Sequence, residues 1–161
     1  MDASGLRIAG LLASRICHDL VGPLGAVSNG LELIAEGDAM AKEALALAQR
    51  SAKRASGRLQ FFRYAFGAAG GEPDFGAAEA RPVALSLLSS GEIAIDWPES
   101  KAVDLPVGVG RLLLNLTLLA VECLPRGGSI RVVLGPNRVG IDATGPQARV
   151  SGDTKAATAR R

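Results

Sequence analysis

An unbroken apolar seam near the N-terminus constrains this fold more than any other feature of the sequence. Apolar residues recur every three or four positions over residues 3–36, which is the spacing of one face of an α-helix. The members of the seam are Leu6, Ala9, Ala13, Ile16, Leu20, Leu24, Val27, Leu31 and Ile34. A rise of about 1.5 Å per residue makes such a helix roughly 50 Å long. We expect it to end at Gly37 and Asp38.

A second amphipathic segment follows directly, over residues 39–66, and carries its own seam. That seam comprises Ala41, Ala44, Ala48, Ala52, Ala55, Leu59, Phe62 and Phe66. Two long helices joined by a short connection pack as antiparallel neighbours. One such hairpin cannot bury both its seam and its flanking leucines. We therefore expect a homodimer, in which two hairpins form a dimeric four-helix bundle.

The composition changes after this hairpin and predicts a second, smaller domain. Gly, Ala and Pro dominate residues 68–76, which is typical of a linker. Beyond the linker, the patterns predict helices over 78–89 and 106–124 and strands over 92–97, 129–134 and 138–143. The expected fold class is therefore α+β. Its parts are a long antiparallel helical hairpin over 1–67, the linker, a small α/β domain over 77–150 and a polar tail over 151–161.

Composition and charge exclude several other classes of protein. The 161 residues carry 18 Lys and Arg against 16 Asp and Glu, and this net charge of +2 is too small to predict nucleic-acid binding. No apolar run reaches the about 20 residues of a membrane-spanning helix, and we see no signal-peptide pattern. The cysteines, Cys17 and Cys123, show neither metal-ligand spacing nor a disulfide framework. We expect a cytoplasmic protein without a membrane or nucleic-acid partner.

The single histidine, His18, lies outside the first seam. It is two positions from Ile16 and from Leu20, so it points about 200° away from each of them around the helix. The residues that share its face are Leu11, Ser14, Arg15, Gly22, Gly25 and Asn29. Glycine costs roughly 1 kcal/mol in a helix interior, and on an outer face it adds nothing to packing. We predict that Gly22 and Gly25 let a partner protein approach the backbone closely.

Pro23 adds a local distortion beside this histidine. A proline inside a helix removes the hydrogen bond to the carbonyl four residues earlier, here that of Asp19, at a cost of about 3 kcal/mol. We therefore expect a helix bend at Pro23. A neutral, exposed imidazole is a nucleophile and can carry a phosphoryl group on a ring nitrogen. Asp19 is placed to orient that ring, and Arg15, one turn earlier, is placed to bind phosphoryl oxygens.

Several segments of the chain resemble a known family. Residues 14–24 (SRICHDLVGPL) resemble the H-box of dimerising histidine-kinase domains, in which an acidic residue follows the histidine and a proline lies five positions beyond it. Over residues 15–33 (RICHDLVGPLGAVSNGLEL) the resemblance narrows to the ChpT-type histidine phosphotransferases of alphaproteobacteria. Residues 62–67 (FRYAFG), 114–116 (LNL) and 124–128 (LPRGG) are also similar to that family.

The resemblance implies a dimeric helical hairpin joined to a degenerate relative of the histidine-kinase ATPase domain. It also implies a phosphorelay, in which His18 accepts a phosphoryl group from an aspartate on the receiver domain of a hybrid histidine kinase. The group then passes to an aspartate of a response regulator, in this family a CtrA- or CpdR-like protein. The receiver would supply Mg²⁺. The receiver-binding surface would comprise Leu11, Ser14, Gly22, Gly25 and Asn29.

An ATP-dependent histidine kinase is the first alternative, and the second half of the chain argues against it. Laid against the kinase N-box, Asn115 matches the first asparagine, but Leu119 occupies the position of the metal-coordinating asparagine. Leucine cannot ligate Mg²⁺, which requires oxygen ligands. Residues 142–145 (DATG) only partly match the nucleotide-binding Asp-x-Gly-x-Gly box. We expect no ATP binding, and no cofactor or metal of the protein's own.

The second alternative is a non-catalytic dimerisation module that sequesters receiver domains. Substituting His18 distinguishes it from a relay, because sequestration needs no phosphoacceptor. A basic face on the second predicted helix leaves two interpretations open: an ordinary solvated surface, or a surface complementary to an acidic receiver. Its members are Lys42, Arg50, Lys53, Arg54, Arg58 and Arg63.

Overall fold

The computed structural model of the chain describes residues 2–37, 40–88, 91–99, 105–135 and 138–150. Contacts between residues group the chain into two compact units, Met1–Phe62 and Arg63–Arg161. The expected break at Asp38 and the polar tail over 151–161 lie outside the described residues, as do residues 136–137 between the last two predicted strands.

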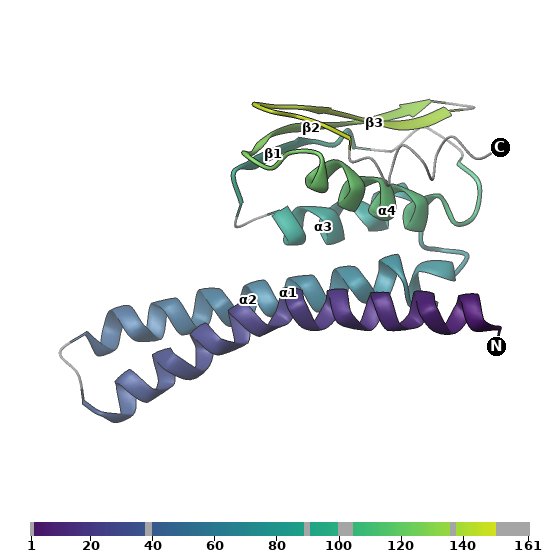
Figure 1. The fold of residues 1–161 in the computed structure, drawn as a ribbon. Coiled ribbons are helices and arrows are strands. Elements are labelled where there is room, and N and C mark those ends of the chain that lie inside the picture. The colour runs from purple at the N-terminus through teal and green to yellow at the C-terminus, as the bar shows by residue number, and fades with distance from the viewer. Residues whose placement is uncertain (1, 38–39, 89–90, 100–104, 136–137, 151–161) are drawn as a thin grey trace. The chain divides into compact units, whose positions relative to one another are not determined.

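The first unit is a helical hairpin. Helix α1 (Ala3–Ala35) begins after Asp2, whose carboxylate accepts a hydrogen bond from the Gly5 backbone N–H at 2.8 Å, and continues through Pro23 as one helix. Helix α2 (Ala41–Ala65) runs antiparallel to it (Figure 1). The two long helices predicted from the seams are thereby confirmed. No described helix is long and apolar enough to cross a membrane.

The contact face between α1 and α2 differs from the predicted seams. The buried residues of α1 are Pro23 and Gly30, whereas the predicted members Leu24 and Leu31 are each 54% exposed. The small residues Ala44, Ala48, Ser51 and Ala55 form the buried side of α2.

The close approach of the two backbones explains this difference. A Cβ added at Gly30 would lie 2.9 Å from the Ala44 carbonyl oxygen and 3.1 Å from the Ala48 Cβ. Leucine side chains do not fit such a separation, so small residues take the interface and the leucines remain outside it. Leu24 and Leu31 are therefore not buried within the single chain, and their burial in a dimer stays a prediction.

The second unit has two layers. Its elements are α3 (Ala77–Leu88), β1 (Ile93–Asp96), α4 (Val109–Glu122), β2 (Gly128–Gly135) and β3 (Arg138–Thr144). The sheet order is β1-β2-β3, with β1 parallel to β2 and β2 antiparallel to β3. Helices α3 and α4 lie on one face of this sheet (Figure 1). Leu88, Ala120, Leu124 and Ile130 form the core between the layers.

These elements confirm the helices and strands predicted for the α/β half, and therefore the α+β class. The predicted and observed limits differ by a few residues. Helix α4 begins at Val109 rather than at residue 106, because Gly108 has a φ of 87°, outside the helical region.

The segment that joins α2 to α3 packs against α4. A short 3₁₀ helix, η1 (Ala68–Gly71), lies within the predicted linker. Arg111 of α4 donates a hydrogen bond to the Gly67 carbonyl, and the Asn115 amide donates one to the Ala65 carbonyl at 3.0 Å. The carbonyls at the end of α2 therefore find donors on α4, as buried helix ends require.

Candidate functional site

His18 stands on an open face of α1. Its side chain is 85% exposed. Five of the predicted neighbours on that face, Leu11, Ser14, Gly22, Gly25 and Asn29, are exposed as well, and Arg15 is half-buried. A Cβ added at Gly22 or at Gly25 would meet no atom within 4 Å. Neither glycine is therefore required by packing within the described chain.

Asp19 supports the imidazole from a half-buried position. Its side chain is 19% exposed, its Oδ1 lies 3.2 Å from His18 Nδ1, and its Oδ2 accepts a hydrogen bond from Arg15 Nε at 3.1 Å. Burial raises the pKa of the Asp19 carboxyl. The hydrogen bonds from His18 and Arg15 and the positive charges of Arg15 and Arg58 outweigh burial, so this pKa lies below the ordinary aspartate value.

The ionised Asp19 carboxylate fixes the roles of the two ring nitrogens. A carboxylate only accepts hydrogen bonds, so the neutral imidazole must carry its proton on Nδ1. The lone pair then belongs to Nε2, the nitrogen that faces away from Asp19. The pair of His18 and Asp19 is thus arranged as a nucleophile with its orienting group. The predicted contact of Arg15 with phosphoryl oxygens remains a prediction, and in the structure its Nε is directed at Asp19.

Arg58 of α2 was not predicted to belong to this site. Its Nη1 donates a hydrogen bond to the backbone carbonyl of Asp19. That carbonyl is the one that Pro23 leaves without a helical donor. The sequence showed the unsatisfied carbonyl but not its partner, because the two residues are 39 positions apart. Val21, one turn from His18, is 68% exposed and was not among the residues predicted for this face.

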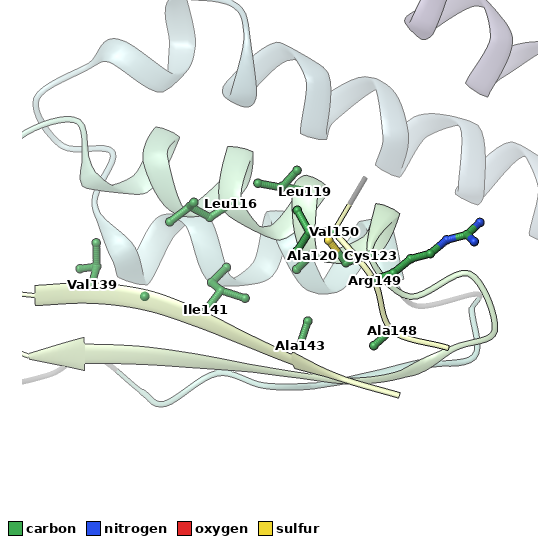
Figure 2. Close-up of a pocket in the computed structure, with 11 residues that line it drawn as sticks. Leu116, Leu119, Ala120, Cys123, Val139, Ile141, Ala143, Ala148, Arg149 and Val150 are labelled. Atoms are coloured by element: carbon green, nitrogen blue, oxygen red, sulfur yellow. The ribbon is translucent and has the colours of Figure 1, made fainter. Parts of the chain in front are cut away.

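The α/β unit has a largely apolar pocket beside α4, the helix that carries the segment compared with the kinase N-box. A pocket between α4 and β3 is lined by Leu116, Leu119, Ala120, Cys123, Val139, Gly140, Ile141, Ala143, Ala148, Arg149 and Val150 (Figure 2). Leu119, at the position of the kinase metal ligand, therefore faces this pocket. The Asn115 amide is instead bonded to the carbonyls of Ala65 and Arg111.

Asp142 lies on the other face of the sheet. Its neighbours Ile141 and Ala143 line the pocket beside α4, and side chains alternate between the two faces of a strand. Across the sheet, Asp142 pairs in register with Arg131 of β2. Within the described part of the chain, no three His, Cys, Asp or Glu side chains are grouped to hold a metal ion.

An exposed imidazole beside an ionised carboxylate is an arrangement that suits the class of histidine phosphotransferases. Comparison with known proteins agrees with that class. The model of the histidine phosphotransferase C-terminal domain matches residues 77–161. The chain belongs to the ChpT-type histidine phosphotransferase family.

Two relatives support this assignment. The chain is 45% identical over 132 residues to the protein phosphotransferase ChpT of Brucella abortus (strain 2308), and the match covers 81% of this chain and 62% of that protein. The chain thus spans less than two thirds of the length of this relative. It is also similar to a bacterial phosphotransferase solved at 1.7 Å, with 36% identity and a TM-score of 0.74. That match covers 94% of this chain and 73% of the solved one.

Proposed function

We propose that the protein relays phosphoryl groups between receiver domains. His18 accepts the group from the aspartyl phosphate of a hybrid kinase's receiver and passes it to the aspartate of a response regulator of CtrA or CpdR type. The observation that carries this proposal is the exposed imidazole whose Nδ1 lies 3.2 Å from the half-buried Asp19 carboxylate. The similarity to the ChpT protein supports it.

In this mechanism, His18 Nε2 attacks the phosphorus of the aspartyl phosphate. A bond forms between Nε2 and phosphorus, and the bond between phosphorus and the receiver's carboxylate oxygen breaks, so the carboxylate leaves with the electron pair. The Nδ1 proton stays on the ring, and the Asp19 carboxylate offsets the positive charge that the ring acquires. The second transfer is the reverse of this step on another receiver. Positioning and electrostatics carry such transfers, and the receiver supplies Mg²⁺.

The receiver docks on the His18 face of α1. Gly22 and Gly25 leave the backbone open to close approach, since neither position is filled by the chain itself. Leu11 and Val21, which are 63% and 68% exposed, add apolar contact area around the imidazole. Ser14 and Asn29 extend the surface along the helix. The basic residues of α2 suit an acidic partner and accelerate encounter.

A homodimer leaves that face accessible. Leu24 and Leu31 of α1 lie about 120–140° around the helix from His18. They remain 54% exposed, and Leu45 and Leu59 of α2 are 46% and 56% exposed. In an antiparallel hairpin these leucines fall on the same side, away from His18. A second copy that buries this leucine stripe completes a four-helix bundle and keeps both imidazoles exposed. We place this dimer in the cytoplasm.

An ATP-dependent kinase is the less favoured function. In a kinase, the helix that corresponds to α4 supplies an oxygen ligand to Mg²⁺, and here that position holds Leu119. The side chain of Asp142 lies on the far face of the sheet from α4, where it cannot reach a nucleotide in the pocket. The same two observations support our proposal that the protein binds no ATP or metal of its own.

A transfer assay tests the relay. The purified chain is mixed with the receiver domain of a hybrid kinase that carries a labelled aspartyl phosphate, and acid-labile label is followed on wild type and on His18→Gln. The relay predicts label on the wild type and at least about a 10³-fold slower transfer to the variant, because the nucleophile is absent. A chase with a response regulator should then remove the label from the wild type.

Two further lanes separate the alternatives. Labelled ATP without a receiver should leave the chain unlabelled, and label in that lane would show a kinase instead. A sequestering module would bind the receiver equally well with and without His18 and take up no label. Equal labelling of the wild type and His18→Gln would contradict His18 as the acceptor.

A further inference from the structure

We propose that Arg58 is a positioning residue of the relay, which holds His18 in its reactive orientation through the backbone of Asp19. This inference rests on the proposed function and adds a residue of α2 to a site that otherwise belongs to α1. Arg58 touches neither the imidazole nor the phosphoryl group. It acts on the residue that orients the imidazole.

The argument begins with the carbonyl of Asp19. In a regular helix this oxygen accepts the N–H of the residue four positions later, but position 23 is proline and has no N–H. Carbonyls withdrawn from water without a donor are costly to the fold. Arg58 Nη1 supplies the missing donor. A charged donor makes roughly twice as strong a hydrogen bond as a neutral one.

Through this hydrogen bond, a residue of α2 fixes the position of the α1 backbone beside the phosphoacceptor. Asp19 is the next residue after His18, and its carboxylate orients the ring through Nδ1. The Arg58 charge also acts on that carboxylate and favours its ionised form. If Arg58 is lost, the carbonyl loses its donor, Asp19 is free to move, and the ring loses its fixed tautomer.

Two alternative roles for Arg58 predict different results. As one more member of the basic face, it would speed receiver encounter and have no effect on the free protein. As a structural residue alone, it would change stability and leave the imidazole as it was. A positioning role changes the ring itself, before any receiver is added.

The first experiment observes that ring directly. Because the chain has a single histidine, the long-range ¹H–¹⁵N spectrum of the imidazole contains signals from His18 alone. At a pH where the ring is neutral, the wild type should show the Nδ1–H tautomer predominantly. The Arg58→Met variant should show a smaller fraction of it. Arg50→Met is the matched control, because it removes an exposed arginine two turns earlier on α2 and should leave the spectrum unchanged.

The second experiment measures the rate of phosphoryl transfer from a phosphorylated receiver, in the wild-type background and in a Pro23→Ala background. Arg58→Met should slow transfer about 10- to 100-fold, as misplacement of a reacting group does. Arg50→Met removes one positive charge from the same helix, so any slowing in that variant measures the effect of lost charge alone. Pro23→Ala restores an N–H that can bond the Asp19 carbonyl. In the Pro23→Ala background, the slowing of transfer by Arg58→Met should be several-fold smaller than in the wild type.

The outcomes decide the proposal separately from the relay. An unchanged tautomer in Arg58→Met, or equal transfer rates for the Arg58 and Arg50 variants, would overturn the positioning role. If Arg58→Met does not fold, the double variant with Pro23→Ala should fold, and its failure to do so would also overturn the proposal. A wild type that takes no label would refute the relay, while the tautomer would still report on Arg58.

Discussion

At the scale of single residues, Asp19 carries the pH dependence of the site. Its pKa in the folded chain is lowered by partners that outweigh its burial, whereas an unfolded aspartate titrates at about 3.9. A depressed folded pKa contributes stability that is present above the unfolded value and is lost as the pH falls through the folded value. The contacts of Asp19 with His18, Arg15 and Arg58 therefore stabilise the hairpin at neutral pH.

Replacing Asp19 with Asn should remove this contribution. We expect Asp19→Asn to lower the free energy of unfolding at neutral pH, and the difference from wild type to shrink as the pH falls through the lowered pKa of Asp19. Urea unfolding at several pH values, followed by circular dichroism, measures the difference. Asp2→Asn is the control, and its effect on the free energy of unfolding should be smaller, because Asp2 is exposed and caps the start of α1. A difference that does not vary with pH would contradict the lowered pKa.

At the scale of elements, two glycines of α1 should respond oppositely to the same methyl group. Gly22→Ala adds a Cβ in open space and improves helix propensity, so the free energy of unfolding should rise by about 0.5–1 kcal/mol. Gly30→Ala places its Cβ 2.9 Å from the Ala44 carbonyl oxygen. Overpacking of this kind costs about 1–3 kcal/mol, so the hairpin should lose stability despite the better propensity.

The functional consequences of these two changes should also differ. The added methyl at position 22 stands where we place the receiver, so Gly22→Ala should slow transfer although the protein is more stable. Gly30→Ala lies on the buried face, and its transfer at a temperature where it remains folded should match the wild type. Thermal unfolding and the transfer assay measure both effects. Full activity of Gly22→Ala would show that the receiver does not need this glycine.

The elements themselves could be predicted from the sequence, and the contacts between them could not. Spacing identified α1, α2 and the three strands, because periodicity depends on local geometry alone. The pairing of Gly30 with Ala44 could not be predicted, since it depends on how closely two backbones approach. Arg58 could be predicted in part. Proline at position 23 indicates that the Asp19 carbonyl lacks a helical donor, but only the fold shows which of the arginines on α2 reaches it. Strand alternation could have shown that Asp142 faces away from Ile141 and Ala143.

At the scale of the whole molecule, the exposed leucine stripe points to a partner outside the single chain. Leu24 and Leu31 on α1, with Leu45 and Leu59 on α2, form an apolar side of the hairpin that no described residue buries. Burial of a leucine side chain is worth about 1.5–3 kcal/mol. These leucines are about half exposed in the single chain, so a second hairpin that covers the stripe gains a part of this contribution from each of them, and the summed gain favours the dimer.

A charge introduced into the stripe should separate the copies. We expect the wild type to have twice the 16.5 kDa mass of the chain, and Leu31→Glu to shift the equilibrium towards the monomer, because the carboxylate would be buried between hairpins. Leu33→Glu is the matched control, since Leu33 is 38% exposed on the same helix but points away from the stripe. Sedimentation velocity at several concentrations measures the masses. A wild type that stays monomeric, or equal effects of the two variants, would mean that the stripe contacts some other partner.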